Sequence, residues 1–209
     1  MGLGFITGLT KKTPQRIQLD AGAVMKNVQL DGVETAEAMK AIVASILKGE
    51  TTSGSLLGAT RGGGTINIAP TVRNLEADGM REPIVGSELV DEWTTTLQTT
   101  LLEVTEDTLS LALPMLEWSG SGGLRIAKLG RNLKEEHYLE NVMWVGNTGF
   151  GLMAVLFENA LHTGGLSMAV QDKGNGTIPV TISAHSNGYA FEEDYLPVKF
   201  FLLDEKASA

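Results

Sequence analysis

Three histidines, His137, His162 and His185, are the residues of this sequence best suited to acid–base chemistry or metal binding. They lie far apart and form neither an HxxxH nor an HExxH pair, so their spacing predicts no metal site. The chain has no cysteine, which excludes disulfides, thiolate zinc sites, iron–sulfur clusters and a cysteine nucleophile. We therefore expect neither a metal nor a cofactor.

Glycine-rich segments could cradle a phosphate, because backbone N–H groups bind anions in tight loops. Gly58–Gly64 (GATRGGG) and Gly120–Gly123 (GSGG) lack the Lys-Ser/Thr ending of a P-loop, however, and the chain contains no GxSxG motif. Flexible turns explain these segments without a ligand.

Carboxylates on or near predicted strands could in principle hydrolyse a glycosidic bond: Asp91, Glu92, Glu103 and Glu117. That reaction needs two carboxyl groups facing one cleft, and aromatic platforms to hold the sugar. Only 6% of the residues are aromatic. We expect a protein that is not an enzyme, with glycoside hydrolysis kept as a minor alternative.

The charged residues are distributed unevenly along the chain. The 16 basic and 25 acidic residues give a net charge of −9, which argues against binding nucleic acid by neutralising phosphates. No Lys or Arg occurs from Glu82 to Leu124, where eight acidic residues lie: Glu82, Glu88, Asp91, Glu92, Glu103, Glu106, Asp107 and Glu117. Basic residues then recur at every third position: Arg125, Lys128, Arg131 and Lys134. Opposite patches suit head-to-tail contacts between identical subunits, although a solvated, segregated surface explains them equally well.

Period-two alternation, typical of β-strands, dominates the chain after residue 64. In Thr65–Val72 the apolar residues fall mainly on one face, and Pro70 places this strand at a sheet edge or a bulge. In Trp93–Leu101 the residues Trp93, Leu97 and Leu101 share a face, and the density of threonine favours a strand over a helix. We expect Trp93 and Trp144 to pack in the core.

Further strands are predicted between turn signals: Ala23–Val28, Glu140–Val145, Leu152–Phe157, Leu166–Val170, Ile178–Ala184 and Val198–Leu203. Period-3.6 patterns predict helices at Thr35–Lys48 and Thr105–Leu113, the first ending in a C-cap at Lys48-Gly49 and the second stopped by Pro114. Gly49–Gly64 is predicted to be a mobile loop. Together these patterns predict one mainly β domain over residues 1–209, a sandwich or barrel with a flanking helix.

The N-terminal residues do not have the charge order of a secretory signal, and no apolar run approaches the roughly 18 residues of a membrane span. We expect a soluble protein of a reducing compartment that does not bind membranes.

Four segments in order resemble the tail tube (major tail) proteins of long-tailed bacteriophages. They cover most of the chain from Asp20 to about His185. The first is Asp20–Val24 with Asn27, and the second is Leu56–Gly63 (LLGATRGG). The third and most specific is Glu76–Gly86 (EADGMREPIVG), which continues into Trp93–Leu97 and Leu101–Thr105. The fourth comprises Asn159–Leu161, Gly164–Leu166, Asp172-Lys173, Ile178–Thr181 and Ala184-His185.

The resemblance implies a tail-tube β-sandwich or half-barrel with a flanking helix and extended loop and terminal arms. Such subunits form hexameric rings that stack into a hollow tube through which DNA is delivered to the host. Members are not enzymes and need no cofactor. The implied partners are further copies of the chain, the tape measure, tail-tip and terminator proteins, and DNA in transit. The implied location is the virion tail, assembled in the host bacterial cytoplasm.

The resemblance also directs attention to particular residues. Candidate ring-joining segments are the arm 1–19, the loop 49–64 and the tail 201–209. An acidic lumen would repel DNA phosphates, and the candidate lumen-lining residues are Glu82, Glu88, Asp91, Glu92, Glu103, Glu106 and Asp107, from the acidic stretch that also includes Glu117. The candidate intersubunit residues are Arg125, Lys128, Arg131, Lys134, Lys48, Glu50 and Arg61.

Two alternatives remain open at this point. The tubes of contractile tails and of type VI secretion systems have the same fold. A β-sandwich that does not assemble and recognises a carbohydrate or a protein would instead stay monomeric and carry a groove with exposed aromatic residues.

Overall fold

The structure is a computed structural model that describes residues 13–30, 32–76, 78–149, 151–170, 172–187 and 195–203. Its helices are α1 (Thr13–Arg16), α2 (Ala36–Leu47), α3 (Glu106–Ala112) and the 3-10 helix η1 (Glu135–His137). Its strands are β1 (Ala23–Lys26), β2 (Ser55–Leu56), β3 (Thr60–Asn74), β4 (Glu88–Leu101), β5 (Leu116–Ser119), β6 (Ile126–Leu129), β7 (Leu139–Thr148), β8 (Gly151–His162), β9 (Ile178–Ser183) and β10 (Val198–Leu202). The prediction of a mainly β fold with a flanking helix is confirmed.

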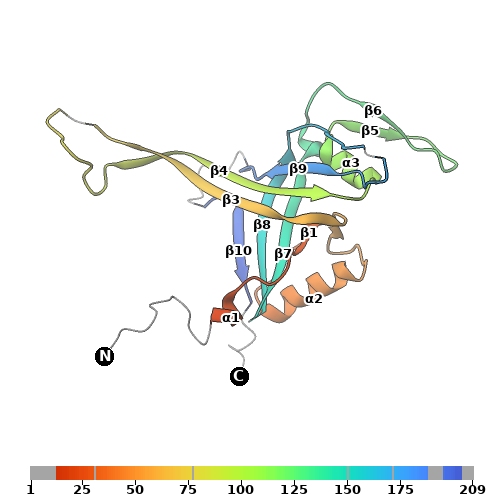
Figure 1. The fold of residues 1–209 in the computed structure, drawn as a ribbon, viewed down its shortest axis with the longest axis horizontal. Coiled ribbons are helices and arrows are strands. Elements are labelled where there is room, and N and C mark those ends of the chain that lie inside the picture. The colour runs from red at the N-terminus through yellow and green to blue at the C-terminus, as the bar shows by residue number, and fades with distance from the viewer. Residues whose placement is uncertain are drawn as a thin grey trace.

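Strand β8 joins two sheet layers. One of its edges pairs with β7, whereas the other edge pairs first with β10, at Met153–Phe157, and then with β9, at Leu161 and His162. The full strand order is β2-β1-β7-β8-β9-β4-β3, and all pairs are antiparallel. Because β9 and β10 share one edge, β9-β4-β3 leaves the plane of β1-β7-β8-β10 and crosses it as a second layer (Figure 1).

The direction change in β8 occurs at Asn159, which has φ 45°. A left-handed φ is uncommon for residues other than glycine, and asparagine is among the residues that tolerate it. Val155 and Phe157 face the core between the two layers, and so does Ala160, so the side-chain alternation shifts by one residue at Asn159. The Asn159 side chain donates to the carbonyl of His185 (3.0 Å), which holds the segment that follows β9 against this kink.

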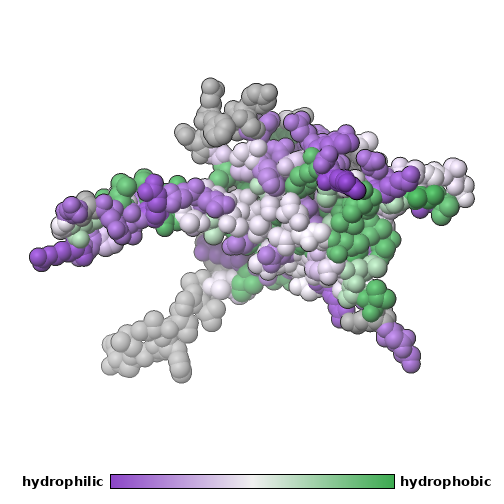
Figure 2. Space-filling view, turned by 90° about the horizontal axis from the view of Figure 1, so that it is seen from above, coloured by the Kyte–Doolittle hydropathy of each residue, from purple (hydrophilic) through white to green (hydrophobic). Residues whose placement is uncertain are grey.

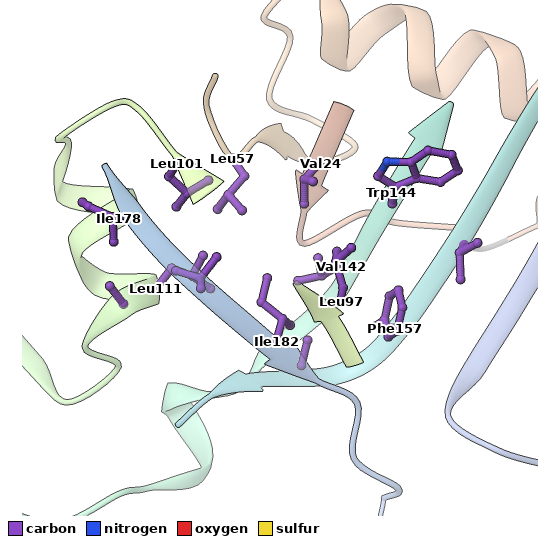
Figure 3. Close-up of a cluster of buried hydrophobic side chains, with 14 residues drawn as sticks. Val24, Leu57, Leu97, Leu101, Leu111, Val142, Trp144, Phe157, Ile178 and Ile182 are labelled. Carbon is purple, nitrogen blue, oxygen red and sulfur yellow. The ribbon is translucent and has the colours of Figure 1, made fainter. Parts of the chain in front are cut away.

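The main core lies between the two layers (Figure 3). Leu97 and Leu101 from β4 meet Val142, Phe157 and other residues of the β1-β7-β8 layer, and all four named side chains are fully buried. Burial of each such side chain contributes about 1.5–3 kcal/mol. The remaining members are Val24, Leu57, Leu111, Ala112, Trp144, Val155, Ala160, Ile178, Val180 and Ile182.

Helix α2 covers the opposite face of the β1-β7-β8-β10 layer. Met39, Val43 and Ile46 form its buried stripe and pack in a second core with residues such as Met143 and Leu156. Thr35 caps the helix, because its Oγ1 accepts from the Ala38 N–H (3.2 Å). Gly49 follows the C-cap with φ 85°. The sequence therefore predicted this helix and both of its ends correctly.

Helix α3 is also confirmed. Thr105 is its N-cap and forms a capping box with the fully buried Thr108. The Thr108 hydroxyl donates to the Glu103 carbonyl (2.8 Å) and accepts from the Thr105 N–H (2.9 Å). These bonds fix the chain where it leaves β4.

Three parts of the sequence prediction are wrong. Leu166–Val170 is not a strand: it contributes only an isolated bridge, from Ala169 to Thr177, just before β9. The predicted loop Gly49–Gly64 contains β2 and the start of β3. Gly62 and Gly63 lie within a register shift of β3 against β4, between Thr60 and Gly64. The hairpin β5–β6 was not predicted, because its four-residue strands are too short to show a clear period.

Gly22 generates a stability prediction. It has φ 73°, and a Cβ there would lie 2.5 Å from both Trp144 Nε1 and the Val145 carbonyl oxygen. Gly32 has nearly the same φ (72°) with no atom within 4 Å of a Cβ. Gly32→Ala should cost about 1–2 kcal/mol from backbone strain alone. Gly22→Ala should cost at least about 1 kcal/mol more because of the collision. Urea unfolding measures both, and equal losses would contradict the packing described for Gly22.

Candidate assembly surfaces

The β3–β4 ribbon extends well beyond the body of the protein (Figure 1). Its pairing continues from Thr60–Leu101 to Asn74–Glu88, with a register shift at Thr71/Val72 that increases the local twist. Along β4 the face that includes Leu97 is buried from position 95 onward, whereas every residue from 88 to 94 is exposed. We call residues 70–93, beyond this boundary, the projecting hairpin.

The projecting hairpin exposes an unusual number of large apolar side chains: Val72, Leu75, Ile84, Val85, Leu89, Val90 and Trp93. Val85 is as exposed as in an extended peptide (102%), and Trp93 is 42% exposed. The prediction that Trp93 packs in the core is therefore wrong, because the opposing layer ends before the strand does; Trp144, at 8%, is buried as predicted. Figure 2 shows apolar and polar surface intermixed along this arm, at the left. Seven large exposed apolar side chains on one short projection are typical of a surface that contacts another protein.

The charge of the projecting hairpin is negative. It has two arginines and six acidic residues, a net charge of 2 − 6 = −4. Arg73 and Asp91 form an ion pair across the two strands (2.7 Å). Within the part of the chain that the structure describes, no ion pair involves Glu82, Glu88 or Glu92; Glu88 accepts only from the Gly86 N–H (3.3 Å).

The β5–β6 hairpin is a second projection, near α3 and on the opposite side of the body (Figure 1). Its two strands pair with no other strand among the described residues, and two strands alone are marginally stable in water. Trp118 Nε1 donates to Ser110 Oγ on α3 (2.7 Å), and Arg125 binds the Glu106 carboxylate in a bidentate manner (2.7–2.9 Å). These contacts hold the hairpin while Leu124, Ile126 and Leu129 stay exposed.

The basic series lies on and after the β5–β6 hairpin, and two of its members are paired within the chain. Arg125 pairs with Glu106, and Lys134 lies 3.0 Å from Glu136 and 4.0 Å from Glu117. The hydrogen bond between Lys134 and Glu136 raises the pKa of Lys134 and lowers the pKa of Glu136. Lys128 and Arg131 form no ion pair with any described residue.

The acidic residues predicted to line a lumen are divided between two regions. Glu82, Glu88, Asp91 and Glu92 belong to the projecting hairpin. Glu103, Glu106 and Asp107 lie at the start of α3, where Asp107 pairs with Lys26 (2.8 Å), and Glu117 is on β5. One chain thus forms no continuous acidic patch, and which carboxylates face a bore stays a prediction.

The other candidate intersubunit residues are all exposed and lie near the body. Lys48 and Glu50 follow α2, and Arg61 is at the start of β3. Of the predicted arms, residues 1–12 and 204–209 lie outside the described residues. The described end of the first arm contains α1 and a bridge from Gln18 to Thr148.

The three histidines occupy structural positions. His162 is buried, with Nδ1 accepting from the Thr181 N–H (3.0 Å) and Nε2 close to the Gly165 carbonyl (3.1 Å). His137 Nδ1 accepts from the Lys134 N–H (3.0 Å). His185 contacts Tyr138 edge-on, with ring centroids 5.2 Å apart. Among the described residues no group of His, Cys, Asp or Glu is arranged to hold a metal.

A cavity of about 470 Å³ lies where the first two family-like motifs meet. Asp20 and Ala21 line it from the first motif, and Gly62 to Gly64 line it from the end of the second and the residue after it. Asp20 Oδ1 accepts from the N–H groups of Gly22 (3.1 Å) and Asn147 (3.2 Å), and the Ala21 carbonyl accepts from Trp144 Nε1 (3.0 Å). These bonds anchor β1 to β7, so the first motif has a structural role.

Comparison with known proteins gives one kind of match. No protein-family model matches the chain, and no curated protein sequence matches it. Among solved structures, the chain is similar to a chain in the tail of an empty GTA particle, computed with helical refinement and C6 symmetry. The TM-score is 0.37 and the identity 11%, over 80% of this chain and 92% of that chain. In the described part of the chain, no helix has the length and apolar character needed to span a membrane.

The projecting hairpin was the main feature that sequence reasoning missed. Its tip is the third motif of the resemblance, yet the candidate ring-joining segments taken from the sequence were 1–19, 49–64 and 201–209. A detectable signal exists: Leu75, Ile84 and Val85 place apolar residues among the turn residues Asp78-Gly79 and Pro83, where a solvated turn would have polar ones.

The exposure of the hairpin predicts that its apolar residues do not stabilise the subunit. The double variant Ile84→Ser/Val85→Ser should change the free energy of unfolding by no more than about 0.5 kcal/mol, because neither side chain is buried. Leu97→Ala, on the buried part of the same ribbon, should cost about 2–5 kcal/mol. Urea unfolding of dilute protein tests both, and a large loss for the double variant would mean that the hairpin packs against its own body.

Proposed function

We propose that this chain is a structural subunit of a phage-type tail tube, which associates with its own copies into hexameric rings that stack around a channel for DNA. The observation that carries the proposal is the projecting hairpin, a paired ribbon that leaves the body and exposes seven large apolar side chains. The exposed side chains do not stabilise the subunit itself. The sequence resemblance to tail tube proteins, whose most specific motif forms the tip of this hairpin, supports the same function.

The free edge of the sheet favours self-association of this kind. Strand β3 is the last strand of its layer and has 15 residues, with no second partner strand among the described residues. A long edge strand exposes backbone N–H and C=O groups that pair readily with another chain. Closure of several copies into a ring satisfies these groups and prevents uncontrolled growth.

The net charge of −9 per subunit suits a channel for DNA. A tube built from such subunits carries a strongly negative field, which keeps phosphates from adhering to the wall. We propose that part of the acidic set from Glu82 to Asp107 faces the bore. The virion tail is the proposed location, and the tape measure, tail-tip and terminator proteins are the proposed partners.

Assembly of the purified chain tests this function. We expect light scattering to show association that increases with protein concentration, and negative-stain electron microscopy to show rings or tubes. Ile84→Ser/Val85→Ser should stay folded by circular dichroism but raise the concentration needed for assembly at least tenfold, the equivalent of about 1.4 kcal/mol, because it removes apolar contact area. Leu166→Ser, a single exposed apolar residue far from the hairpin in sequence, is the control and should assemble normally.

A wild-type chain that stays monomeric at high concentration and low salt would contradict the proposed function. That outcome would favour the alternative of a β-sandwich that does not assemble.

A further inference from the structure

We infer that the projecting hairpin of one copy docks on the β5–β6 hairpin of a neighbouring copy. The inference rests on the proposed function, since it names the contact that would join two subunits. It commits to a second copy of this chain as the occupant of both surfaces.

The positions of the two hairpins favour a head-to-tail contact. They lie at opposite ends of the molecule along its longest axis (Figure 1), and both stand clear of the body in the view from above (Figure 2). One subunit therefore presents one surface at each end, and the two surfaces differ. Contacts between unlike surfaces repeat from copy to copy and produce rings or filaments, whereas contacts between identical surfaces stop at a dimer.

The charges of the two surfaces are complementary. The projecting hairpin has a net charge of −4, whereas Leu116–Lys134 contains four basic residues and one acidic residue, a net charge of 4 − 1 = +3. Ion pairs within the chain neutralise part of each surface: Arg73 with Asp91 on one side, and Arg125 with Glu106 and Lys134 with Glu136 on the other. Among the described residues, the charged side chains of the projecting hairpin without an ion pair are five acids and Arg81, whereas Lys128 and Arg131 have none on the other surface.

Apolar side chains accompany the charges on both surfaces. Ile84 and Val85 are 61% and 102% exposed at the hairpin tip, and Leu124 and Leu129 are 62% and 58% exposed on the other hairpin. The isolated β5–β6 sheet also gains the most from a covering layer, because a two-stranded sheet is marginal alone. An apolar centre surrounded by charged residues is the usual arrangement of a specific interface.

Charge reversal with a mixing step tests the contact. Glu82→Lys/Glu92→Lys changes the net charge of the projecting hairpin from −4 to −4 + 4 = 0, and Lys128→Glu/Arg131→Glu changes that of Leu116–Lys134 from +3 to 3 − 4 = −1. Each variant alone removes the attraction between the two surfaces, which is −4 against +3 in the wild type, so the concentration needed for assembly should rise roughly tenfold or more at low salt. A mixture of the two variants should recover assembly, because the lysines introduced in one variant can then face the glutamates introduced in the other, and the unchanged hairpins of each variant keep the wild-type contact. Combining all four substitutions in one chain should recover it too.

The matched control for Glu82→Lys/Glu92→Lys is Glu34→Lys/Asp172→Lys, which makes the same change of +4 in net charge at positions outside both hairpins. It should assemble like the wild type. Circular dichroism and urea midpoints confirm that each variant is folded.

The outcomes separate the contact from the proposed function. If the wild type assembles and both reversal variants do so equally well, the contact is wrong and the proposed function stands. If both variants fail singly and the mixture fails as well, the contact is again wrong, because restored complementarity has no effect. A wild-type chain that never assembles would contradict both the proposed contact and the proposed function.

Discussion

The shared edge of β8 is the constraint on which the rest of this fold depends. A strand edge offers one row of hydrogen-bonding groups, and here β10 uses the first half of the row and β9 uses the second. Since both cannot continue side by side in one plane, the β9-β4-β3 layer must cross the β1-β7-β8-β10 layer. The left-handed backbone of Asn159 makes that change of direction possible within a single strand. The main core is the space enclosed by the crossing.

The crossing also explains why the hairpin projects. A layer that crosses another is supported only where the two overlap, and the strands β3 and β4 have 15 and 14 residues, far more than the overlap needs. Thr95, Leu97 and Thr99 lie inside the overlap and are buried, whereas Trp93 lies just outside it. The side chains therefore alternate in the same way along the whole of β4, but those at one end are buried and stabilise the core, whereas those at the other end form an exposed surface.

The contrast between the covered and uncovered parts of β4 shows how much of the structure the sequence predicts. Local patterns predicted α2 with its C-cap at Lys48-Gly49, α3 from Thr105 to the stop at Pro114, and the strand containing Pro70 at the sheet edge. They also placed Leu97 on the face that is buried. They could not predict the exposure of Trp93, because a period of two residues reports which side chains share a face and not whether another layer covers that face.

The misses in the loops have related causes. Leu166–Val170 has alternating apolar residues but forms only the Ala169–Thr177 bridge, so its local pattern was not sufficient for a strand. Strands β5 and β6 form despite their short length because Trp118 and Arg125 attach them to α3, a tertiary contact that no local pattern reports. The sequence therefore predicted a set of charged residues for assembly, but only the three-dimensional structure shows which of them lie on the projecting hairpin and which on the β5–β6 hairpin.

The separation of charge follows from strand geometry. In sequence the acidic stretch from Glu82 to Glu117 is continuous and reads as one patch. A strand advances about 3.3 Å per residue, so the 14 residues of β4 carry Glu88 roughly 45 Å from the end where α3 begins. At that distance, several Debye lengths at physiological salt, the two halves act independently. Near α3, Glu106 pairs with Arg125 and Asp107 pairs with Lys26. The acidic residues of the projecting hairpin have only two arginines near them in sequence. The two ends of the longest axis thus differ in the charges that no described ion pair neutralises: mainly acidic side chains on the projecting hairpin, and Lys128 and Arg131 at the other end. Attraction between these charges favours a head-to-tail arrangement of copies.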